Sequence, residues 1–409
     1  MELNYALLRE IEQEQGGAFY LLDTELFTQN YRELLEAFRH YYPNTHIAYS
    51  YKTNYTPRLC KIVDELGGYA EVVSAMEYEI TKRLNIPTSK VHFNGPFKDT
   101  DAVEEIILGG GCVNLDDYVE VPNIIKLAEE HPDKTIRIGI RCNFKINDGV
   151  TSRFGFDVTK PSFNELIKKL TAQKNIQIIG IQCHYACRAL ETWEPRAEGI
   201  CEQYDHMPCN SLEHIDLGGG LYGKMKDSLK VQFSTPIPNY CEYAKEVAAF
   251  ISMHFANVPD KPDLFIEPGS ALVGDAMKFV APVVSIKDIR GKAIATLQGS
   301  IYNINPTLNK KNPPITVYTD SCEKREEFSN LDFAGYTCIE GDYLYKGYNG
   351  KLGINDLVVF DNVGSYSIVL KPPFILPNFP VIELKNVSRQ TVKRKETFDD
   401  LFQTYEFNF

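Results

Sequence analysis

The sequence lacks the features that mark nucleic-acid binders, membrane proteins and disulfide-stapled domains. Acidic residues outnumber basic ones by 55 to 43 and no basic run occurs, so the net charge of −12 argues against nucleic-acid partners. No apolar stretch reaches the length of a membrane span, and the acidic N-terminal residues lack the basic-then-apolar order of a signal peptide. Ten cysteines are scattered without a C-x-x-C pair, which predicts reduced thiols, no metal site and a cytoplasmic location.

Short apolar runs alternate with amphipathic helical patterns up to about residue 280. The strand-like runs are residues 47–51, 69–73, 91–93, 112–115, 136–141, 178–183, 214–217 and 264–266. Helical patterns lie between them at residues 57–66, 74–84, 101–108, 118–130, 162–172 and 241–254. This rhythm predicts a (β/α)8 barrel of the TIM type over residues 23–280. An open doubly wound sheet is the alternative, which the absence of a G-x-G-x-x-G motif after the first strand disfavours.

A different pattern follows residue 280, where strand-like runs are joined by Gly, Pro and Asn turns without long helical patterns. These runs are residues 280–287, 293–299, 315–319, 356–362 and 366–370. We therefore expect a β domain over residues 281–409, built as a Greek-key barrel or a sandwich. Residues 18–22 are also strand-like, so residues 1–22 are expected to join this domain.

Polar residues stand at the ends of the predicted barrel strands, where a barrel of this type places its chemistry. The first, second, fifth, sixth and eighth strands end at Lys52, Glu71, Arg141, His184 and Glu267. A lysine at such a position can be desolvated and can hold a carbonyl cofactor as a Schiff base. A single polar strand end is explained by a turn or by a satisfied polar group, but the joint placement is not.

Two further motifs suit a phosphorylated pyridine cofactor. DLGGG at residues 216–220 follows an apolar run, and its glycines let backbone N–H groups approach a phosphate without Cβ clashes. Glu267 precedes Pro-Gly at a strand end, and a carboxylate there can keep a pyridine nitrogen protonated. His184 can stack on an aromatic ring, although a lone histidine is more often structural.

Six motifs in order make the resemblance to a known family specific. The chain resembles the fold-type III pyridoxal-phosphate decarboxylases, the group of the diaminopimelate and ornithine decarboxylases, from about residue 18 to residue 380. The matching stretches are YSYKTN (49–54), GIQCH (180–184), DLGGG (216–220), EPG (267–269), GYTCIEGD (335–342) and DNVGSY (361–366). The last two resemble the GPxCxxxD loop and the NxGAY motif of that family.

The resemblance implies a role for each matching residue. Lys52 would hold pyridoxal 5'-phosphate as a Schiff base, His184 would stack on its ring, and Glu267 would pair with its nitrogen. The phosphate would bind Gly218, Gly219, Gly220, Gly269 and the Tyr366 hydroxyl. Glu71 and Arg141 complete the expected cofactor site. Cys338 would act in the site of a neighbouring subunit, so we expect a homodimer with composite active sites.

The resemblance predicts decarboxylation of an amino acid, but several positions depart from the family. The arginine of its EPGR motif is Ser270 here, and a stretch like RPALY appears as NPTLN around Asn305. These changes put diaminopimelate in doubt and favour a cationic or modified amino acid. Arg153 or Arg188 could supply the lost charge, and Asp342 or Glu340 could meet a distal ammonium. The alternatives are an amino-acid racemase or epimerase on the same scaffold, and a non-catalytic pyridoxal-phosphate-binding regulator.

Overall fold

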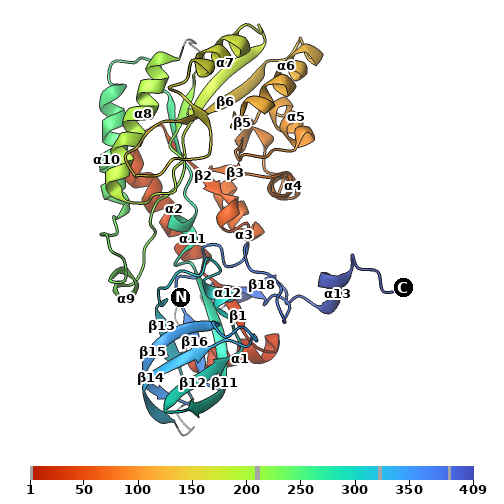
Figure 1. The fold of residues 1–409 in the computed structure, drawn as a ribbon, viewed down its shortest axis with the longest axis vertical. Coiled ribbons are helices and arrows are strands. Elements are labelled where there is room, and N and C mark those ends of the chain that lie inside the picture. The colour runs from red at the N-terminus through yellow and green to blue at the C-terminus, as the bar shows by residue number, and fades with distance from the viewer. Residues whose placement is uncertain (1–2, 208–211, 321–324, 386–387) are drawn as a thin grey trace. The chain divides into compact units, whose positions relative to one another are not determined.

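The chain divides into two compact units in a computed structural model, which describes residues 3–207, 212–320, 325–385 and 388–409 (Figure 1). The barrel unit comprises residues 29–222 and 235–271. The β unit comprises residues 1–28, 223–234 and 272–409. These limits lie close to the predicted ones, except that residues 223–234 group with the β unit although they fall inside the predicted barrel.

Eight parallel strands form the barrel unit's closed sheet. They are β2 (Thr45–Ser50), β3 (Tyr69–Val72), β4 (Val91–Phe93), β5 (Cys112–Leu115), β6 (Ile136–Asn143), β8 (Ile176–Gln182), β9 (His214–Asp216) and β10 (Asp263–Ile266). The sheet closes because β10 pairs with both β2 and β9, and β5 pairs with both β4 and β6. Each predicted apolar run is one of these strands, so the (β/α)8 architecture is confirmed. A short strand, β7 (Phe156–Asp157), extends the edge of β6.

Helices precede and separate the barrel strands, and a local sequence signal marks the start of α4. They are α2 (Thr24–Arg39), α3 (Pro57–Glu65), α4 (Ala75–Arg83), α5 (Thr100–Leu108), α6 (Val121–Glu130), α7 (Pro161–Thr171), α8 (Trp193–His206) and α10 (Tyr240–His254), with 3₁₀ turns η1 (Tyr51–Thr53), η2 (Thr88–Lys90), η3 (Tyr118–Glu120) and η4 (Leu190–Thr192). Helix α4 begins where the Ser74 side chain accepts the Glu77 N–H, as its capping pattern predicts. Figure 1 shows α8 and α10 side by side on one flank of the barrel.

A cluster of aromatic rings fills part of the barrel interior. The Phe265 ring on β10 has its centre 4.4 Å from that of His92 on β4 and 5.3 Å from that of His214 on β9. The rings of His46 and Tyr69 also contact Phe265. Burial lowers the pKa of His92 from its ordinary value of 6.5 to about 4, so the ring is neutral in the folded protein at neutral pH.

We expect His92 to make the barrel unit sensitive to acid. The unfolded chain binds a proton at this histidine near pH 6.5, whereas the folded protein does so only near pH 4. The contribution of His92 to the unfolding free energy should therefore fall by about 3 kcal/mol as the pH drops across this interval. Urea unfolding followed by the fluorescence of Trp193, the single tryptophan, measures this loss.

The variant His92→Leu should lose less stability than the wild type between pH 6.5 and pH 4. A matched change at the exposed His40, His40→Leu, should follow the wild-type profile. Equal acid sensitivity of the wild type and His92→Leu would show that this ring takes up its proton in the folded state as readily as in the unfolded chain.

The β unit is a mixed sheet. Its strands are β1 (Phe19–Leu22), β11 (Met277–Ile289), β12 (Lys292–Leu297), β13 (Ile315–Tyr318), β14 (Glu326–Ala334), β15 (Tyr343–Leu352), β16 (Leu357–Phe360), β17 (Val381–Lys385) and β18 (Ser388–Lys393). Strand β1 pairs antiparallel with β11 and parallel with β17, which confirms that the N-terminal strand joins this unit. Its helices are α1 (Tyr5–Gln15), α9 (Asp227–Lys230), α11 (Ser270–Val273, across the unit boundary), α12 (Ile301–Ile304) and α13 (Phe398–Phe402).

One predicted strand of the β unit is wrong. Residues 366–370 form a turn, closed by a hydrogen bond from Leu370 N to Tyr366 O at 2.9 Å. Tyr366 has a φ of 66°, a left-handed conformation that takes the backbone out of the extended form. The apolar residues of this run therefore mark a packed turn rather than a strand.

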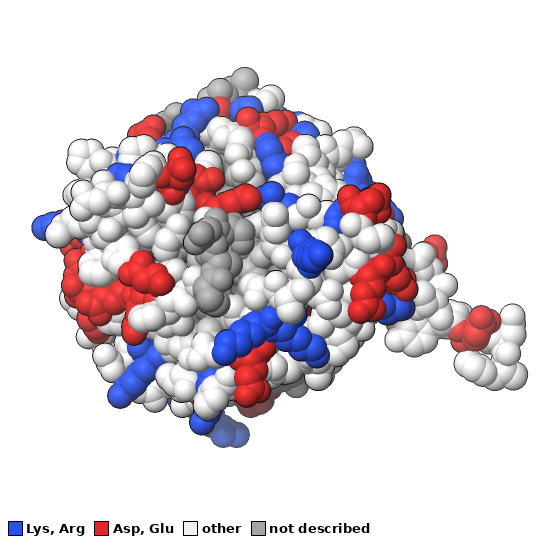
Figure 2. All heavy atoms as spheres, turned by 90° about the horizontal axis from the view of Figure 1, so that it is seen from above, with Lys and Arg blue, Asp and Glu red and all other residues white. Residues whose placement is uncertain are grey.

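Charge is mixed on the face that Figure 2 presents, where blue and red side chains are interspersed and no broad basic area forms. Among the described residues, no helix combines the length and the apolar composition needed to cross a bilayer. The eight cysteines within the described ranges are free thiols, while Cys209 and Cys322 lie outside those ranges.

Candidate active site

Lys52 lies in the turn η1 directly after β2 and faces a buried carboxylate. Its Nζ is hydrogen-bonded to Oε2 of Glu71 on β3, and Ser50 Oγ donates to the same oxygen at 2.6 Å. Glu71 has no exposed surface. Burial alone would lower the pKa of Lys52, but the charges of Glu71 and Glu267 outweigh it and raise this pKa. Glu71 and Ser50 therefore fix the position of the Lys52 ammonium group.

Glu267, at the end of β10, is the second buried carboxyl group of the site. Asn94 Nδ2 donates to Glu267 Oε1 at 2.5 Å and to Glu71 Oε1 at 3.2 Å, and so links the two carboxyl groups. Gln182 Nε2 lies 3.4 Å from Glu267 Oε1. Burial raises the pKa of Glu267 well above its usual range, and the negative charges of Asp216 and Glu71 raise it further.

His184 presents a neutral imidazole ring beside this carboxyl group. Gly219 N–H donates to His184 Nδ1 at 3.0 Å, so the ring carries its proton on Nε2. Burial lowers the pKa of His184 well below 6.5, and the charges of Lys52, Arg141 and Arg196 lower it further. A neutral flat ring suits stacking against an aromatic cofactor.

The glycine-rich loop packs too closely for any side chain at its centre. A Cβ on Gly218 would lie 2.5 Å from the Cys183 carbonyl oxygen, and one on Gly219 would lie 2.5 Å from that of Glu267. Gly218 N–H donates to Asp216 Oδ1 at 2.8 Å, so the N–H groups of Gly218 and Gly219 are both already used.

The unused N–H groups of this loop therefore begin at Gly220, one step later than the motif implies. Within the described ranges, the N–H groups of Gly220 and Leu221 have no hydrogen-bond acceptor. Leu221 is 2% exposed. Buried donors without a partner are costly, and a phosphate oxygen would satisfy them. At Gly269, a Cβ would lie 2.0 Å from Thr53 Oγ1, so this position also requires glycine.

The predicted arginines have three different environments. Arg141 is buried and pairs with Asp116 through Nη1 and Oδ1 at 2.9 Å, so its charge is already balanced. Arg153 is exposed, and its guanidinium lies 4.1 Å from the centre of the Phe154 ring. Arg188 Nη2 donates to Oγ of Ser270 at 3.3 Å, at the position where the EPGR motif carries its arginine.

In the β unit, the Cys338 loop has an exposed tip and a buried base. Cys338, Ile339 and Glu340 are exposed. Asp342 is buried, and its Oδ1 accepts hydrogen bonds from Ser300 Oγ at 3.0 Å and from Ile301 N at 2.7 Å.

Thr337 occupies the other oxygen of Asp342. Its Oγ1 donates to Asp342 Oδ2 at 2.6 Å, and its N–H lies 3.3 Å from the same atom. Both oxygens of Asp342 thus already accept hydrogen bonds, and its contact with a distal ammonium stays a prediction. Glu340 remains the predicted acidic residue at the tip.

The segment of residues 361–366, also in the β unit, ends at Tyr366. Gly364 N–H donates to Gly274 O at 3.0 Å, and a Cβ on Gly364 would lie 1.8 Å from the Val273 carbonyl oxygen. Within the described part of the chain the Tyr366 hydroxyl has no hydrogen-bond partner, which leaves it available to an oxygen-rich ligand.

Several residues of the barrel site were absent from the predicted set. Ser50, Asn94, Gln182 and Asp216 hold the carboxyl groups and the glycine loop, and each is a polar residue at a strand end, the signal that identified Lys52. Arg196 on α8 was also missed. It stands within an apolar stripe of that helix, and a buried arginine at such a position needs partners that the sequence does not show.

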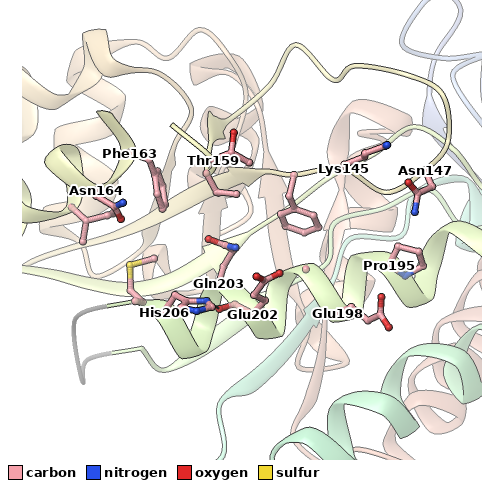
Figure 3. A pocket seen from close by; sticks show the side chains of 15 residues that line it. Lys145, Asn147, Thr159, Phe163, Asn164, Pro195, Glu198, Glu202, Gln203 and His206 are labelled. Atoms are coloured by element: carbon pink, nitrogen blue, oxygen red, sulfur yellow. Dashed lines mark hydrogen bonds between the residues drawn. The ribbon is translucent and has the colours of Figure 1, made fainter. Parts of the chain in front are cut away.

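A separate cavity of about 630 Å³ lies between α7 and α8 (Figure 3). Phe144 and Phe163 line it, together with Glu198, Glu202 and Gln203 on α8. None of the predicted site residues lines this cavity, so it is distinct from the lysine site.

The barrel residues fit pyridoxal phosphate on three observations. The carboxyl groups of Glu71, Asp216 and Glu267 are all buried, and one ammonium group, that of Lys52, lies among them. A protonated ring nitrogen would supply the cation that Glu267 needs. Gly220 and Leu221 offer N–H donors to a phosphate, and Lys52 offers an amine to an aldehyde. A barrel with this set of groups defines a pyridoxal-phosphate enzyme.

Comparisons with known proteins agree with this class. Residues 28–274 match the pyridoxal-binding domain of the pyridoxal-dependent decarboxylases. Diaminopimelate decarboxylase of Aquifex aeolicus is 25% identical over 414 residues, which cover 96% of this chain and 92% of that protein. The L-glutamyl-[BtrI acyl-carrier protein] decarboxylase of Niallia circulans is also 25% identical, and the match covers 99% of this chain and 97% of that protein.

A solved structure agrees in fold. The crystal structure of diaminopimelate decarboxylase from M. jannaschii has a TM-score of 0.86 at 21% identity, covering 98% of this chain and 94% of that one. The chain belongs to the pyridoxal-dependent decarboxylase family. It is a pyridoxal-phosphate-dependent amino-acid decarboxylase. This activity is compatible with both substrate classes predicted from the sequence, a cationic amino acid and a modified one.

Replacing the site lysine tests the assignment of Lys52. The purified protein with added pyridoxal phosphate should absorb near roughly 420 nm, the band of a cofactor joined to a lysine. Lys52→Ala should lose this band because no amine remains at the end of β2. The half-buried Lys61 on α3, which pairs with Asp64, provides the control, since Lys61→Ala should retain the band. A full band in Lys52→Ala would assign the bond to another lysine.

Proposed function

We propose that the protein is a homodimeric decarboxylase of an α-amino acid whose distal end carries no free charge. A distal carboxyl group masked as a thioester or an amide has this property. The observation that carries this proposal is the loss of an arginine expected to bind a distal carboxylate, together with the hydrogen-bonded state of Asp342. Asn305 stands where the second arginine of the family is expected, and the two oxygens of Asp342 accept hydrogen bonds from Ser300 and Thr337.

Asn305 illustrates why the second arginine has no substitute at its own position. It is 8% exposed, and its Nδ2 donates to Asn309 O at 2.7 Å while its Oδ1 accepts from Asn309 Nδ2 at 2.7 Å. The Asn305 amide is hydrogen-bonded within its own turn and is uncharged, so it cannot replace an arginine opposite a distal carboxylate. The relative that acts on a carrier-bound glutamyl group supports a masked substrate of this kind.

Pyridoxal phosphate, when bound, takes up the electron pair released as the bond between Cα and the carboxylate breaks. Lys52 would hold the cofactor, and Glu71 with Ser50 would orient Nζ. Glu267 would hold the ring nitrogen in its protonated form, because its carboxyl group is buried and fixed by Asn94. His184 would stack on one face of the cofactor ring, and because its imidazole is neutral it would add no charge there.

A substrate panel tests the proposed distal group. Carbon dioxide release should be fastest with L-glutamate masked as a γ-thioester of a pantetheine-type thiol, with kcat/KM at least about tenfold above free glutamate. Lysine, ornithine, arginine and both diaminopimelate stereoisomers complete the panel. Highest kcat/KM on meso-diaminopimelate would contradict the masked substrate and assign the carboxylate contact to another residue. Highest kcat/KM on lysine or ornithine would assign the distal contact to Glu340.

The proposed composite site gives a second test. Lys52→Ala should be inactive because it lacks the amine, and Cys338→Ala should be strongly impaired because the loop tip loses its thiol. If Cys338 acts in the site of the partner subunit, co-refolded equal amounts of the two variants should regain about a quarter of the wild-type activity, since half of the dimers then hold one intact site. Activity no higher than that of the parent variants would place Lys52 and Cys338 in the site of a single chain.

A further inference from the structure

Arg188 lies where three strand-end loops of the barrel unit meet. It belongs to the loop after β8, and its guanidinium carbon lies 5.5 Å from the centre of the Tyr222 ring, just beyond the glycine loop. Its Nη2 donates to Ser270 Oγ at 3.3 Å, in the loop after β10. Tyr243 on α10 fixes its backbone by donating a hydrogen bond from its hydroxyl to Arg188 O at 2.6 Å. The guanidinium is thereby held beside the residue that replaces the EPGR arginine.

The charge of Arg188 is not balanced by the part of the protein that the structure describes. A guanidinium has five N–H donors, and one of those on Arg188 is used by a neutral hydroxyl. No described carboxylate forms an ion pair with it, and the side chain is half-buried. An arginine fixed in this way, with donors to spare, is suited to an oxyanion.

Arg196 on α8 is a second arginine without a carboxylate partner among the described residues. It is fully buried and stacks on Trp193, with its guanidinium carbon 4.3 Å from the ring centre. Nη1 donates to Gly219 O at 2.9 Å, and Nη2 donates to Cys187 O. These bonds join the glycine loop to the loop that carries Arg188. Because a buried charge without a counter-ion is costly, an anion nearby would stabilise this arrangement.

We propose that Arg188 binds the phosphate group of the cofactor in place of the missing EPGR arginine. Arg196 acts as a positioning residue, because its hydrogen bonds to Gly219 O and Cys187 O hold the two loops together. The positive charge has thus moved from the loop after β10 to the loop after β8, while its place in space beside Ser270 is kept.

The surroundings of Arg188 favour a phosphate over the carboxylate of a substrate. The unpartnered N–H groups of Gly220 and Leu221 belong to the loop that Arg196 ties to the Arg188 loop. A Cβ on Gly220 would lie 3.0 Å from Cys187 O, so these two loops are in direct contact. Two N–H donors together with a guanidinium match the three oxygens and double charge of a phosphate.

The first experiment compares pyridoxal phosphate with pyridoxal, which lacks the phosphate. Arg188→Gln should weaken the binding of pyridoxal phosphate by roughly 10- to 100-fold, because a charged hydrogen bond is lost. The affinity for pyridoxal should be unchanged. Absorbance titration of the cofactor-free protein measures both constants, and inorganic phosphate should compete with the cofactor more weakly in the variant than in the wild type.

A charge relocation provides the matched variant. Arg188→Gln combined with Ser270→Arg restores the arginine of the EPGR motif, and should recover most of the affinity for pyridoxal phosphate. The surface change Arg83→Ala, which removes an arginine paired with Glu79 on α4, should alter neither constant.

Three results would overturn the proposal. Equal losses of affinity for pyridoxal phosphate and pyridoxal would show that Arg188 supports the loop rather than the phosphate. Unchanged cofactor affinity with a raised KM would assign Arg188 to a substrate carboxylate. Failure of Ser270→Arg to recover the affinity would show that the charge has not moved between these two loops.

The positioning role of Arg196 has its own readout. Arg196→Met should lower the affinity for pyridoxal phosphate several-fold and leave that for pyridoxal unchanged, because the glycine loop loses its tie to Cys187 O. A purely structural role would change both affinities together and would contradict the assignment.

Discussion

The site depends on the burial of more carboxyl groups than the barrel itself can neutralise. Glu71, Asp216 and Glu267 lie at three strand ends with one ammonium group, that of Lys52, among them. Two like charges about 4 Å apart repel by about 4 kcal/mol near a protein surface, and by more in the interior. The structure meets this repulsion with amides from Asn94 and Gln182 and with a raised pKa at Glu267. A cation beside Glu267 is therefore strongly favoured, and a protonated pyridine ring is one.

The opposite sign dominates around the glycine loop. Arg196 and Arg188 bring two positive charges to loops that expose backbone N–H groups, and neither has a carboxylate partner among the described residues. One end of the site thus favours a cation and the other an anion. Pyridoxal phosphate carries its ring nitrogen and its phosphate as two separate charged groups, and these match the two ends of the charge pattern.

The barrel was predictable because strands buried on both faces are continuous apolar runs, and each ends at a polar residue. The strands β14 and β15 were missed because they are only partly buried and carry charged and glycine residues, so they lack a continuous apolar run. Lys52, Glu71, His184 and Glu267 followed from their positions at strand ends. Arg196 did not, since its partners are backbone carbonyls. The sequence also does not show the hydroxyls of Ser300 and Thr337 that donate hydrogen bonds to Asp342.

The division of the chain also determines the order in which its parts can fold during synthesis. The barrel closes when β10 pairs with β2, and all of its strands have been made by residue 266. Strand β1 is made first, yet its partners β11 and β17 come far later in the chain. Such distant pairing is slow. An emerging chain can therefore complete its barrel while β1 still lacks its partners, and the Cys338 loop is made only after the barrel is complete.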